Sequence, residues 1–204
     1  MSTSKKIKVK FFTNISLELA SILLEVNGKR ILVDPGRNER NVGVNQILPF
    51  YELQNLDAIV ITHYHGDHAN LIDEILESGK FRGRIICHKA TAEIIQTYYN
   101  VEESLAQIIK LDYRKSYDLL DNNMLTLYDA GHVLGSSVVY LKFKDKVIVI
   151  TGDLGADFLP IVREPTTVFP RDVRIDLLIV DAKQAIRPRQ VDSRITPLGD
   201  VIYR

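Results

Sequence analysis

The feature that most constrains this chain is a run of ligand-type side chains directly after a predicted buried strand. Residues 56–61 are mostly apolar, as in a strand buried on both faces, and the run His63-Tyr64-His65-Gly66-Asp67-His68 follows at once after Thr62. Imidazole suits zinc and similar metals, and a carboxylate adds a harder ligand. Helix capping alone does not call for three imidazoles beside a carboxylate. The run therefore predicts a metal site at the carboxyl end of this strand.

The backbone around the run predicts that it reaches two adjacent metals. His63 and His65 are two residues apart in an extended segment, so their side chains point to the same side. Asp67 and His68 lie at the start of a predicted helix and project in a different direction. One short segment can thus face two metal positions.

Two later segments are expected to supply the remaining ligands. Residues 129–137 present His132 between glycines, and residues 150–153 end in Gly152 and Asp153. Each follows an apolar strand, and glycine allows the backbone to approach a site closely. Either segment alone would be weak evidence, but together with the first run they form a consistent ligand set.

The periodicity of the chain predicts an α/β fold in which two sheets pack together with helices outside. Asn27-Gly28 is a hairpin signal, because both central positions of such a turn favour positive φ. The predicted strands span residues 7–12, 19–26, 30–33, 56–61, 84–87, 124–128, 137–143, 147–151 and 175–180. The predicted helices span residues 68–78 and 91–99.

Composition is that of an ordinary globular protein. The 204 residues suit one sizeable domain, and 26 basic residues balance 26 acidic ones, so no global field attracts a polyanion or an anionic membrane. Cys87 is the one cysteine, no apolar run reaches the roughly 20 residues that span a bilayer, and the first ten residues do not resemble a signal peptide. We therefore expect a cytoplasmic protein with no membrane partner.

In combination, the ligand segments resemble the metallo-β-lactamase fold over about residues 7–182. The motifs are Asp34 in VDPG, the HYHGDH run, AGHVLGSS and TGD. The resemblance implies an αββα sandwich that binds two Zn²⁺ ions per chain. It implies these roles: His63, His65 and His132 hold the first metal; Asp67, His68 and Asp153 hold the second; Asp153 bridges both; Asp67 orients the catalytic hydroxide; Asp34 orients the ligand loop.

The motifs also resemble one branch of that fold, the β-CASP nucleases, which include messenger 3′-end processing factors. AGHVLGSS, TGDLG and the stretch from LPIVREP to DLLIVD carry this likeness, and Asp181 falls where the branch has an acidic residue. The resemblance implies a dinuclear zinc phosphodiesterase that acts on RNA or single-stranded nucleic acid. Because AGHVLGS also resembles ligase-associated exonucleases, the choice between RNA and DNA stays open.

The sequence departs from this branch after residue 180. Residues 181–185 replace a stretch like ESTYG, and no histidine follows His132, whereas the branch inserts a β-CASP domain here and returns with two late histidines. We therefore expect a partial, N-terminal portion of the fold over residues 1–182, with 183–204 as a tail or the start of a further segment. A homo- or hetero-oligomer, or a continuation, would complete the site. His88 is expected to be structural rather than a substitute ligand.

Two alternative functions remain. A small-molecule hydrolase of thioester or lactone type would use the same fold, but it does not account for the stretch from LPIVREP to DLLIVD. A non-catalytic subunit paired with an active homologue is the other alternative. The intact metal-ligand set argues against it, since a subunit freed from catalysis has little reason to keep six ligands.

Overall fold

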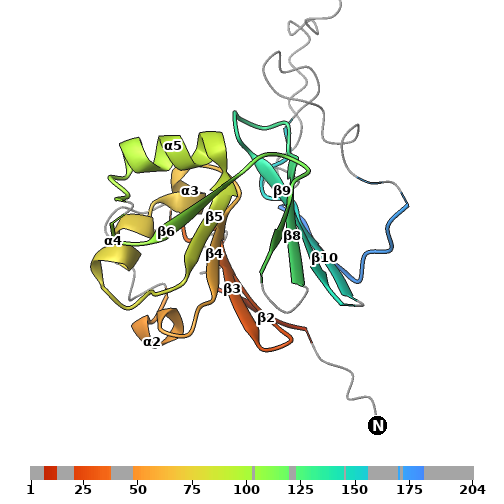
Figure 1. Cartoon of the computed structure of the whole chain (residues 1–204), viewed down its shortest axis with the longest axis horizontal. Coiled ribbons are helices and arrows are strands. Elements are labelled where there is room, and N and C mark those ends of the chain that lie inside the picture. Colours follow the sequence, from red (N-terminus) through yellow and green to blue (C-terminus); the bar gives the residue numbers. More distant parts are fainter. Residues whose placement is uncertain are drawn as a thin grey trace, which may run out of the picture.

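The computed structural model describes residues 7–12, 21–37, 48–102, 104–119, 123–144, 146–155, 170 and 172–181, which form two sheets and a layer of short helices (Figure 1). The first sheet has the order β1-β2-β3-β4-β5-β6 and comprises β1 (Lys8–Phe11), β2 (Ile22–Val26), β3 (Lys29–Val33), β4 (Ala58–Ile61), β5 (Arg84–His88) and β6 (Gln107–Leu111). The second has the order β11-β10-β9-β8-β7 and comprises β7 (Ser116–Asp118), β8 (Asn123–Asp129), β9 (Ser137–Phe143), β10 (Lys146–Ile150) and β11 (Leu177–Ile179). The helices are α2 (Phe50–Leu53), α3 (Gly66–Ala69), α4 (Ile72–Glu77) and α5 (Lys89–Tyr98).

Strand direction places the carboxyl ends of several strands at one edge of the molecule. The predicted Asn27-Gly28 turn joins β2 to β3, with φ of 53° and 80° at the two residues. From β3 to β6 the first sheet is parallel. In the second sheet β10 and β11 are also parallel, while the other pairs are antiparallel. Loops that leave β3, β4 and β5 therefore share an edge.

Two hydrophobic cores hold the layers together. One core fills the space between the sheets, where Ile31 and Val60 of the first sheet pack with Leu127 and Ile150 of the second. The other core lies between the first sheet and the helices and includes Ile59 and several residues of α4 and α5. Figure 1 shows the helices on one side of the first sheet and the second sheet on the other. The predicted sheet-on-sheet arrangement with outer helices is confirmed.

The prediction of one helix over residues 68–78 is wrong. The segment forms α3 and α4, which are separated by Asn70 and Leu71. The backbone N–H of Leu71 donates to the carbonyl of Pro35 at 3.0 Å, and the Asn70 side chain both accepts from Arg37 N and donates to Arg37 O, each at 2.8 Å. Hydrogen bonds to the loop after β3 thus replace the helical continuation at this point.

The structure also contains elements that the sequence analysis did not predict, namely α2, β6 and β7. The predicted boundary between residues 182 and 183 lies outside the described residues, as does most of the proline-containing stretch between 155 and 174. Within the described residues, no helix has the length and hydropathy that a membrane crossing requires.

Candidate metal centre

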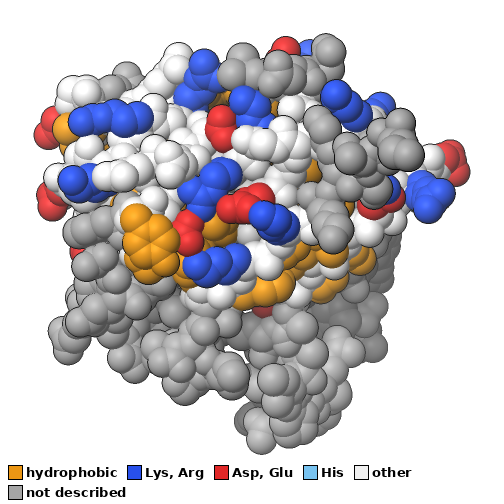
Figure 2. All heavy atoms as spheres, turned by 90° about the horizontal axis from the view of Figure 1, so that it is seen from below, with side chains coloured by type: hydrophobic (Ala, Val, Ile, Leu, Met, Phe, Trp, Pro, Cys, Tyr) orange, Lys and Arg blue, Asp and Glu red, His pale blue; other side chains and the backbone are white. Residues whose placement is uncertain are grey.

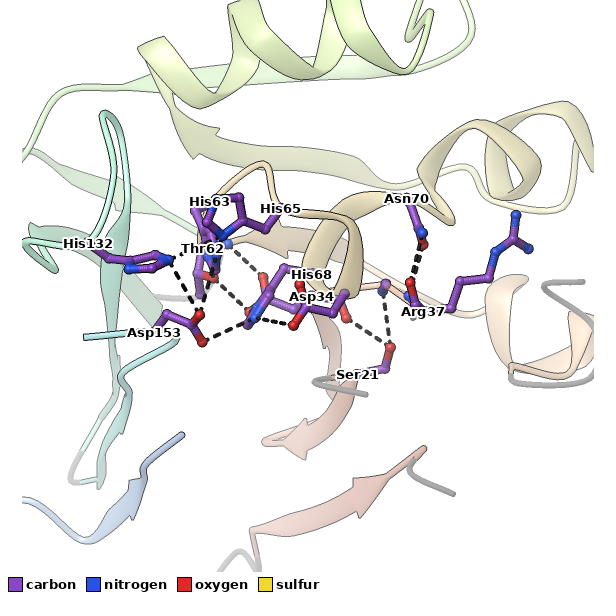
Figure 3. Close-up of polar contacts among 12 residues, drawn as sticks. Ser21, Asp34, Arg37, Thr62, His63, His65, His68, Asn70, His132 and Asp153 are labelled. Carbon is purple, nitrogen blue, oxygen red and sulfur yellow. Dashed lines mark hydrogen bonds and ion pairs between the residues drawn. The ribbon is translucent and has the colours of Figure 1, made fainter. Parts of the chain in front are cut away.

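The predicted ligands come together at the edge where the parallel strands end (Figure 3). His63 follows β4, and His65 is the N-cap residue of α3. His132 lies in the turn between β8 and β9, and Asp153 lies just beyond β10. Ligand-type side chains from both sheets therefore meet at a single place between them.

Three imidazoles and one carboxylate form what we call the histidine cluster, made of His63, His65, His132 and Asp153. One ligand atom from each of these residues lies within 4.8 Å of the others. His65 Nδ1 is 3.0 Å from His63 Nε2 and 3.2 Å from His132 Nε2. Asp153 Oδ2 is 3.4 Å from His132 Nε2 and 3.9 Å from His63 Nε2. The potential ligand atoms of the four side chains thus surround a common point.

A second group, which we call the carboxylate cluster, contains His68, Asp153 and Asp181. Their ligand atoms also lie within 4.8 Å of one another. His68 Nε2 is 3.2 Å from Asp153 Oδ1, and the Asp67 carboxylate approaches the same nitrogen to 3.7 Å. Asp153 therefore turns one oxygen toward each cluster, the arrangement that a bridging ligand requires.

Asp34 holds the rings in place from behind. Its Oδ2 accepts a hydrogen bond from Thr62 Oγ1 at 2.7 Å and lies 2.9 Å from His68 Nδ1, while Oδ1 accepts from the Thr62 backbone N–H at 2.7 Å. Thr62 Oγ1 is also 3.1 Å from His63 Nδ1. Because the single hydroxyl proton is donated to Asp34, His63 Nδ1 must carry the proton in that contact. His63 and His68 consequently both present Nε2 to the clusters.

The turn that carries His132 is fixed by a buried serine. Ser136 Oγ accepts from the backbone N–H groups of His132 and Val133, each at 3.1 Å. The Ser136 carbonyl in turn accepts from the Ala130 N–H and from the Tyr113 hydroxyl, the latter at 2.8 Å. These hydrogen bonds satisfy the polar groups of the turn and set the position of the His132 backbone.

Gly152 allows β10 to approach the first sheet at the site. Its φ is +54°, and a Cβ at this position would lie 2.8 Å from Thr62 Oγ1 and 2.9 Å from Thr62 Cβ. The neighbouring backbone N–H of Ser137 donates to the Thr62 carbonyl at 2.9 Å. Close backbone contact at Thr62 therefore brings Asp153 of one sheet to the histidines of the other.

The titration behaviour of the site divides it into a neutral and a charged part. Burial, reinforced by the surrounding imidazoles, lowers the pKa of His63 well below its usual value. Burial also acts to lower the pKa of His68, but the carboxylates of Asp34 and Asp153 outweigh it and raise this pKa to about 10. The contact with His68 holds the pKa of Asp153 far below its ordinary range. In the metal-free protein, the proton on His68 thus supplies the positive charge that a metal cation would supply at the same place.

The residues fit a bound metal. His68 Nε2 and Asp153 Oδ1 are buried side-chain atoms that make no hydrogen bond to any described residue, although they face each other. Buried polar atoms are normally hydrogen-bonded, and a cation bound here would supply a partner to both atoms at once. Imidazole and carboxylate groups are the donors that zinc and related divalent metals prefer. The histidine cluster alone offers the four ligands of a tetrahedral zinc site.

The structure places the predicted site residues as follows. The two clusters contain five of them: His63, His65, His68, His132 and Asp153. Asp67 lies beside His68 but belongs to neither cluster. Asp34 contacts His68 Nδ1, on the side of the ring away from the carboxylate cluster. Asp181, predicted only as a family acidic position, joins the carboxylate cluster. His88 accepts from the Ala90 N–H as the N-cap of α5 and stacks on Tyr113, as its structural interpretation predicted.

The role of Thr62 was missed by the sequence analysis, which treated it only as the end of a strand. Its hydroxyl links Asp34 to His63, and its backbone contacts both sheets. A polar residue between a buried strand and the first histidine was a signal that could have marked it.

The opposite edge of the molecule has a different character. Figure 2 shows this face, where basic and acidic side chains are interspersed and no histidine is seen among the described residues. Ion pairs join Lys8 to Glu25, Lys29 to Asp57 and Lys10 to Glu52. Because both signs occur together, the described side chains of this face produce no uniform positive field for a polyanion.

Comparison with known families and proteins identifies relatives of this arrangement. A model described as the Metallo-beta-lactamase superfamily matches residues 20–188. The transcription termination factor FttA of a Lokiarchaeum species is 26% identical over 197 residues, covering 85% of this chain and 30% of that protein. The endoribonuclease ysh-1 of Neurospora crassa is 27% identical over 217 residues, covering 89% of this chain and 24% of that protein. The chain thus spans between 21% and 30% of the length of these and similar curated relatives.

Solved structures show the same fold at low sequence identity. A HARLDQ-motif mutant of a metallo-beta-lactamase from Cronobacter sakazakii has a TM-score of 0.58 at 17% identity and covers 89% of this chain and 81% of its own. A metallo-beta-lactamase fold protein from Bacillus subtilis has a TM-score of 0.52 at 20% identity, covering 66% of this chain and 54% of its own. At these identities the likeness concerns the arrangement of the strands and helices.

Proposed function

The chain belongs to the metallo-beta-lactamase superfamily, and we propose that it is a metal-dependent phosphodiesterase that cleaves RNA. The observation that carries the proposal is Asp153, whose two carboxylate oxygens face different ligand groups, Oδ1 toward His68 and Oδ2 toward His63 and His132. A shared carboxylate of this kind suits a pair of metal ions rather than one. The relatives named as an endoribonuclease and a termination factor support RNA as the substrate class.

Each site residue has a proposed role in holding the metals. The histidine cluster would hold one zinc ion, and Asp67, His68 and Asp153 would hold the other. Two such ions supply Lewis acidity toward a phosphate oxygen and lower the pKa of an attacking water. Asp34 and Thr62 keep the two buried imidazoles oriented, so that Nε2 of His63 and of His68 faces the cations.

Asp67 is the proposed catalytic carboxylate. Its side chain is 14% exposed and its Oδ2 lies 3.7 Å from His68 Nε2, so it lies beside the site and is only partly accessible to solvent. A carboxylate there can orient the attacking water and accept its proton. Asp67→Asn keeps the shape of the side chain but removes the base.

The β-CASP branch is the finer form of this proposal. The motifs AGHVLGSS and TGDLG and the two curated relatives support it, with residues 1–182 as the metallo-β-lactamase-like domain. Participation of a second chain in the site stays a prediction. Because the chain spans 30% or less of these relatives, the substrate and the mode of cleavage are part of the proposal.

The test is cleavage of end-labelled single-stranded RNA by the purified protein in the presence of zinc. We expect cleavage that chelation abolishes, and a loss of at least about 100-fold for Asp67→Asn, the range for removing a general base. His65→Ala serves as the metal-site control and Asp172→Asn as the surface control. Intact RNA with the zinc-loaded wild-type protein, or equal cleavage by His65→Ala, would contradict the proposal.

A further inference from the structure

We propose that Asp181 is itself a metal ligand and makes the second metal position a carboxylate-rich site, chemically distinct from the histidine-rich first position. This inference rests on the proposed function, since it concerns the second cation of the same centre. It assigns a coordinating role to a residue that the sequence motifs mark only as acidic.

Strand register places Asp181 at the site. β10 and β11 are parallel, with Ile150 opposite Ile179, so Asp181 lies level with Gly152, the residue before Asp153. The Thr151 N–H donates to the Ile179 carbonyl at 3.0 Å, and the Asp181 N–H donates to Thr151 Oγ1 at 3.1 Å. The pairing therefore continues beyond the strands and fixes the Asp181 backbone beside that of Asp153.

The side chains of the carboxylate cluster converge on one position. The ligand atoms of His68, Asp153 and Asp181 lie within 4.8 Å of one another. The His68 side chain is 1% exposed. Neither its Nε2 nor Asp153 Oδ1 makes a hydrogen bond to a described residue. Two acidic side chains and a buried imidazole nitrogen that makes no hydrogen bond to a described residue thus surround one position. A divalent cation at that position would be within reach of all three.

The donor sets of the two positions differ. The histidine cluster offers three imidazoles and one carboxylate, whereas the carboxylate cluster offers one imidazole and two carboxylates. Imidazole favours zinc and similar metals, while carboxylate and water suit harder ions such as Mn²⁺. The second position should therefore bind zinc more weakly than the first and should accept Mn²⁺ while zinc occupies the first.

Metal titration of the metal-free protein tests this inference without an activity measurement. Calorimetry with Zn²⁺ should resolve a tight and a weaker site, and Mn²⁺ added after one equivalent of Zn²⁺ should bind, as followed by the loss of free Mn²⁺ signal in electron paramagnetic resonance. For Asp181→Asn we expect the second event to weaken by about 10-fold or more while the first changes less than about 2-fold. Asp172→Asn, which removes an exposed carboxylate from the same segment, should match the wild type.

A second variant distinguishes the loss of a metal ligand from misfolding as the cause of weaker metal binding. Asp181→Cys replaces a hard oxygen donor by a soft thiolate, so it should gain a thiolate-to-metal charge-transfer band when Co²⁺ fills the second position. The wild type and Asp172→Cys should show no such band, since Cys87 is fully buried away from solvent. Circular dichroism spectra that match the wild type would confirm that both variants are folded.

The outcomes separate this inference from the proposed function. An unchanged second event in folded Asp181→Asn, absence of the band in Asp181→Cys, or a single binding event in the wild type would overturn the role of Asp181. RNA cleavage with unaltered metal binding by Asp181→Asn would leave the proposed function intact. Asp181-dependent binding of a second metal without RNA cleavage would contradict the proposed function and support the ligand.

Discussion

At the scale of single residues, the site depends on one buried carboxylate that several groups share. Asp34 accepts hydrogen bonds from the Thr62 backbone and hydroxyl and contacts His68 Nδ1. The Thr62 hydroxyl in turn contacts His63 Nδ1 and so helps to orient that ring. Asp34 also has a positive φ of 54°, which aspartate tolerates better than most residues. Loss of its charge should therefore disturb both clusters although Asp34 is in neither.

Asp34→Asn is expected to weaken zinc binding by about 10-fold to 100-fold, the usual effect of removing a group that orients a metal ligand. The amide cannot accept at both of its side-chain atoms, so either Thr62 or His68 loses its partner. Competition with a chelator of known affinity measures the change, and Asp172→Asn is the matched control. Equal affinities for Asp34→Asn and the wild type would show that Asp34 does not position the rings.

The raised pKa of His68 predicts how the metal-free protein responds to pH. The group binds its proton more tightly when folded, so its contribution to stability is fully present below the unfolded pKa near 6.5 and is lost as pH rises through about 10. Chelated protein should therefore lose stability toward alkaline pH more steeply than His68→Gln does. Urea unfolding at several pH values between 6 and 10 measures this difference. Parallel curves for the two proteins would refute the assignment.

At the scale of elements, what the sequence could predict depends on whether the determining contacts are local. The β4 strand, the Asn27-Gly28 turn and the histidine run were all predictable, because hydrophobic pattern and turn chemistry act over a few residues. The break between α3 and α4 was not, since it depends on hydrogen bonds from Asn70 to Arg37, more than thirty positions away. Segment 107–111, which forms β6, is short and only partly buried, so its pattern is weak.

The carboxylate cluster shows the same limit at the functional site. His63, His65 and His68 stand out in the sequence because they are close together in it. Asp181 is 28 positions from Asp153, and the two meet only through the parallel register of β10 and β11. A sequence motif can mark Asp181 as a candidate functional residue. Which side chains surround it depends on the order and register of the strands, which the motif does not contain.

The close approach of β10 to β4 makes a specific glycine essential. Gly152→Ala should destabilise the protein by more than the roughly 1 to 2 kcal/mol of a left-handed residue, because its Cβ also meets Thr62, and it should displace Asp153 and weaken zinc binding. Gly79→Ala is the matched control: φ is +61°, but nothing lies within 4 Å of the added Cβ. Denaturant unfolding and zinc titration of both variants measure the two effects. Equal behaviour of the two variants would contradict the close-contact argument.

At the scale of the whole molecule, the metal centre joins the two sheets. His63, His65 and His68 belong to the segment that follows β4 of the first sheet, whereas His132, Asp153 and Asp181 follow strands of the second. The core between the sheets places both sets at the same edge. Bound metal should therefore hold the sandwich together as well as serve chemistry.

Metal removal is consequently expected to lower thermal stability. Zinc at about 1,000 times its dissociation constant should add about 4 kcal/mol, which corresponds to roughly 8 to 16 °C for a protein of this size. Differential scanning calorimetry with and without chelator measures the shift. His65→Ala should show less of it, and a wild-type melting temperature that is insensitive to chelator would argue against a metal that bridges the sheets.

An anomalous-scattering map of zinc-loaded crystals, collected at the zinc absorption edge, tests most directly whether the site holds two metals. We expect two peaks roughly 3.5 to 4 Å apart, the spacing of two-metal catalytic sites, with Asp153 between them. One peak should be surrounded by His63, His65 and His132, and the other should lie between His68 and Asp181. A single peak, or two peaks of which neither contacts Asp153, would contradict a two-metal site.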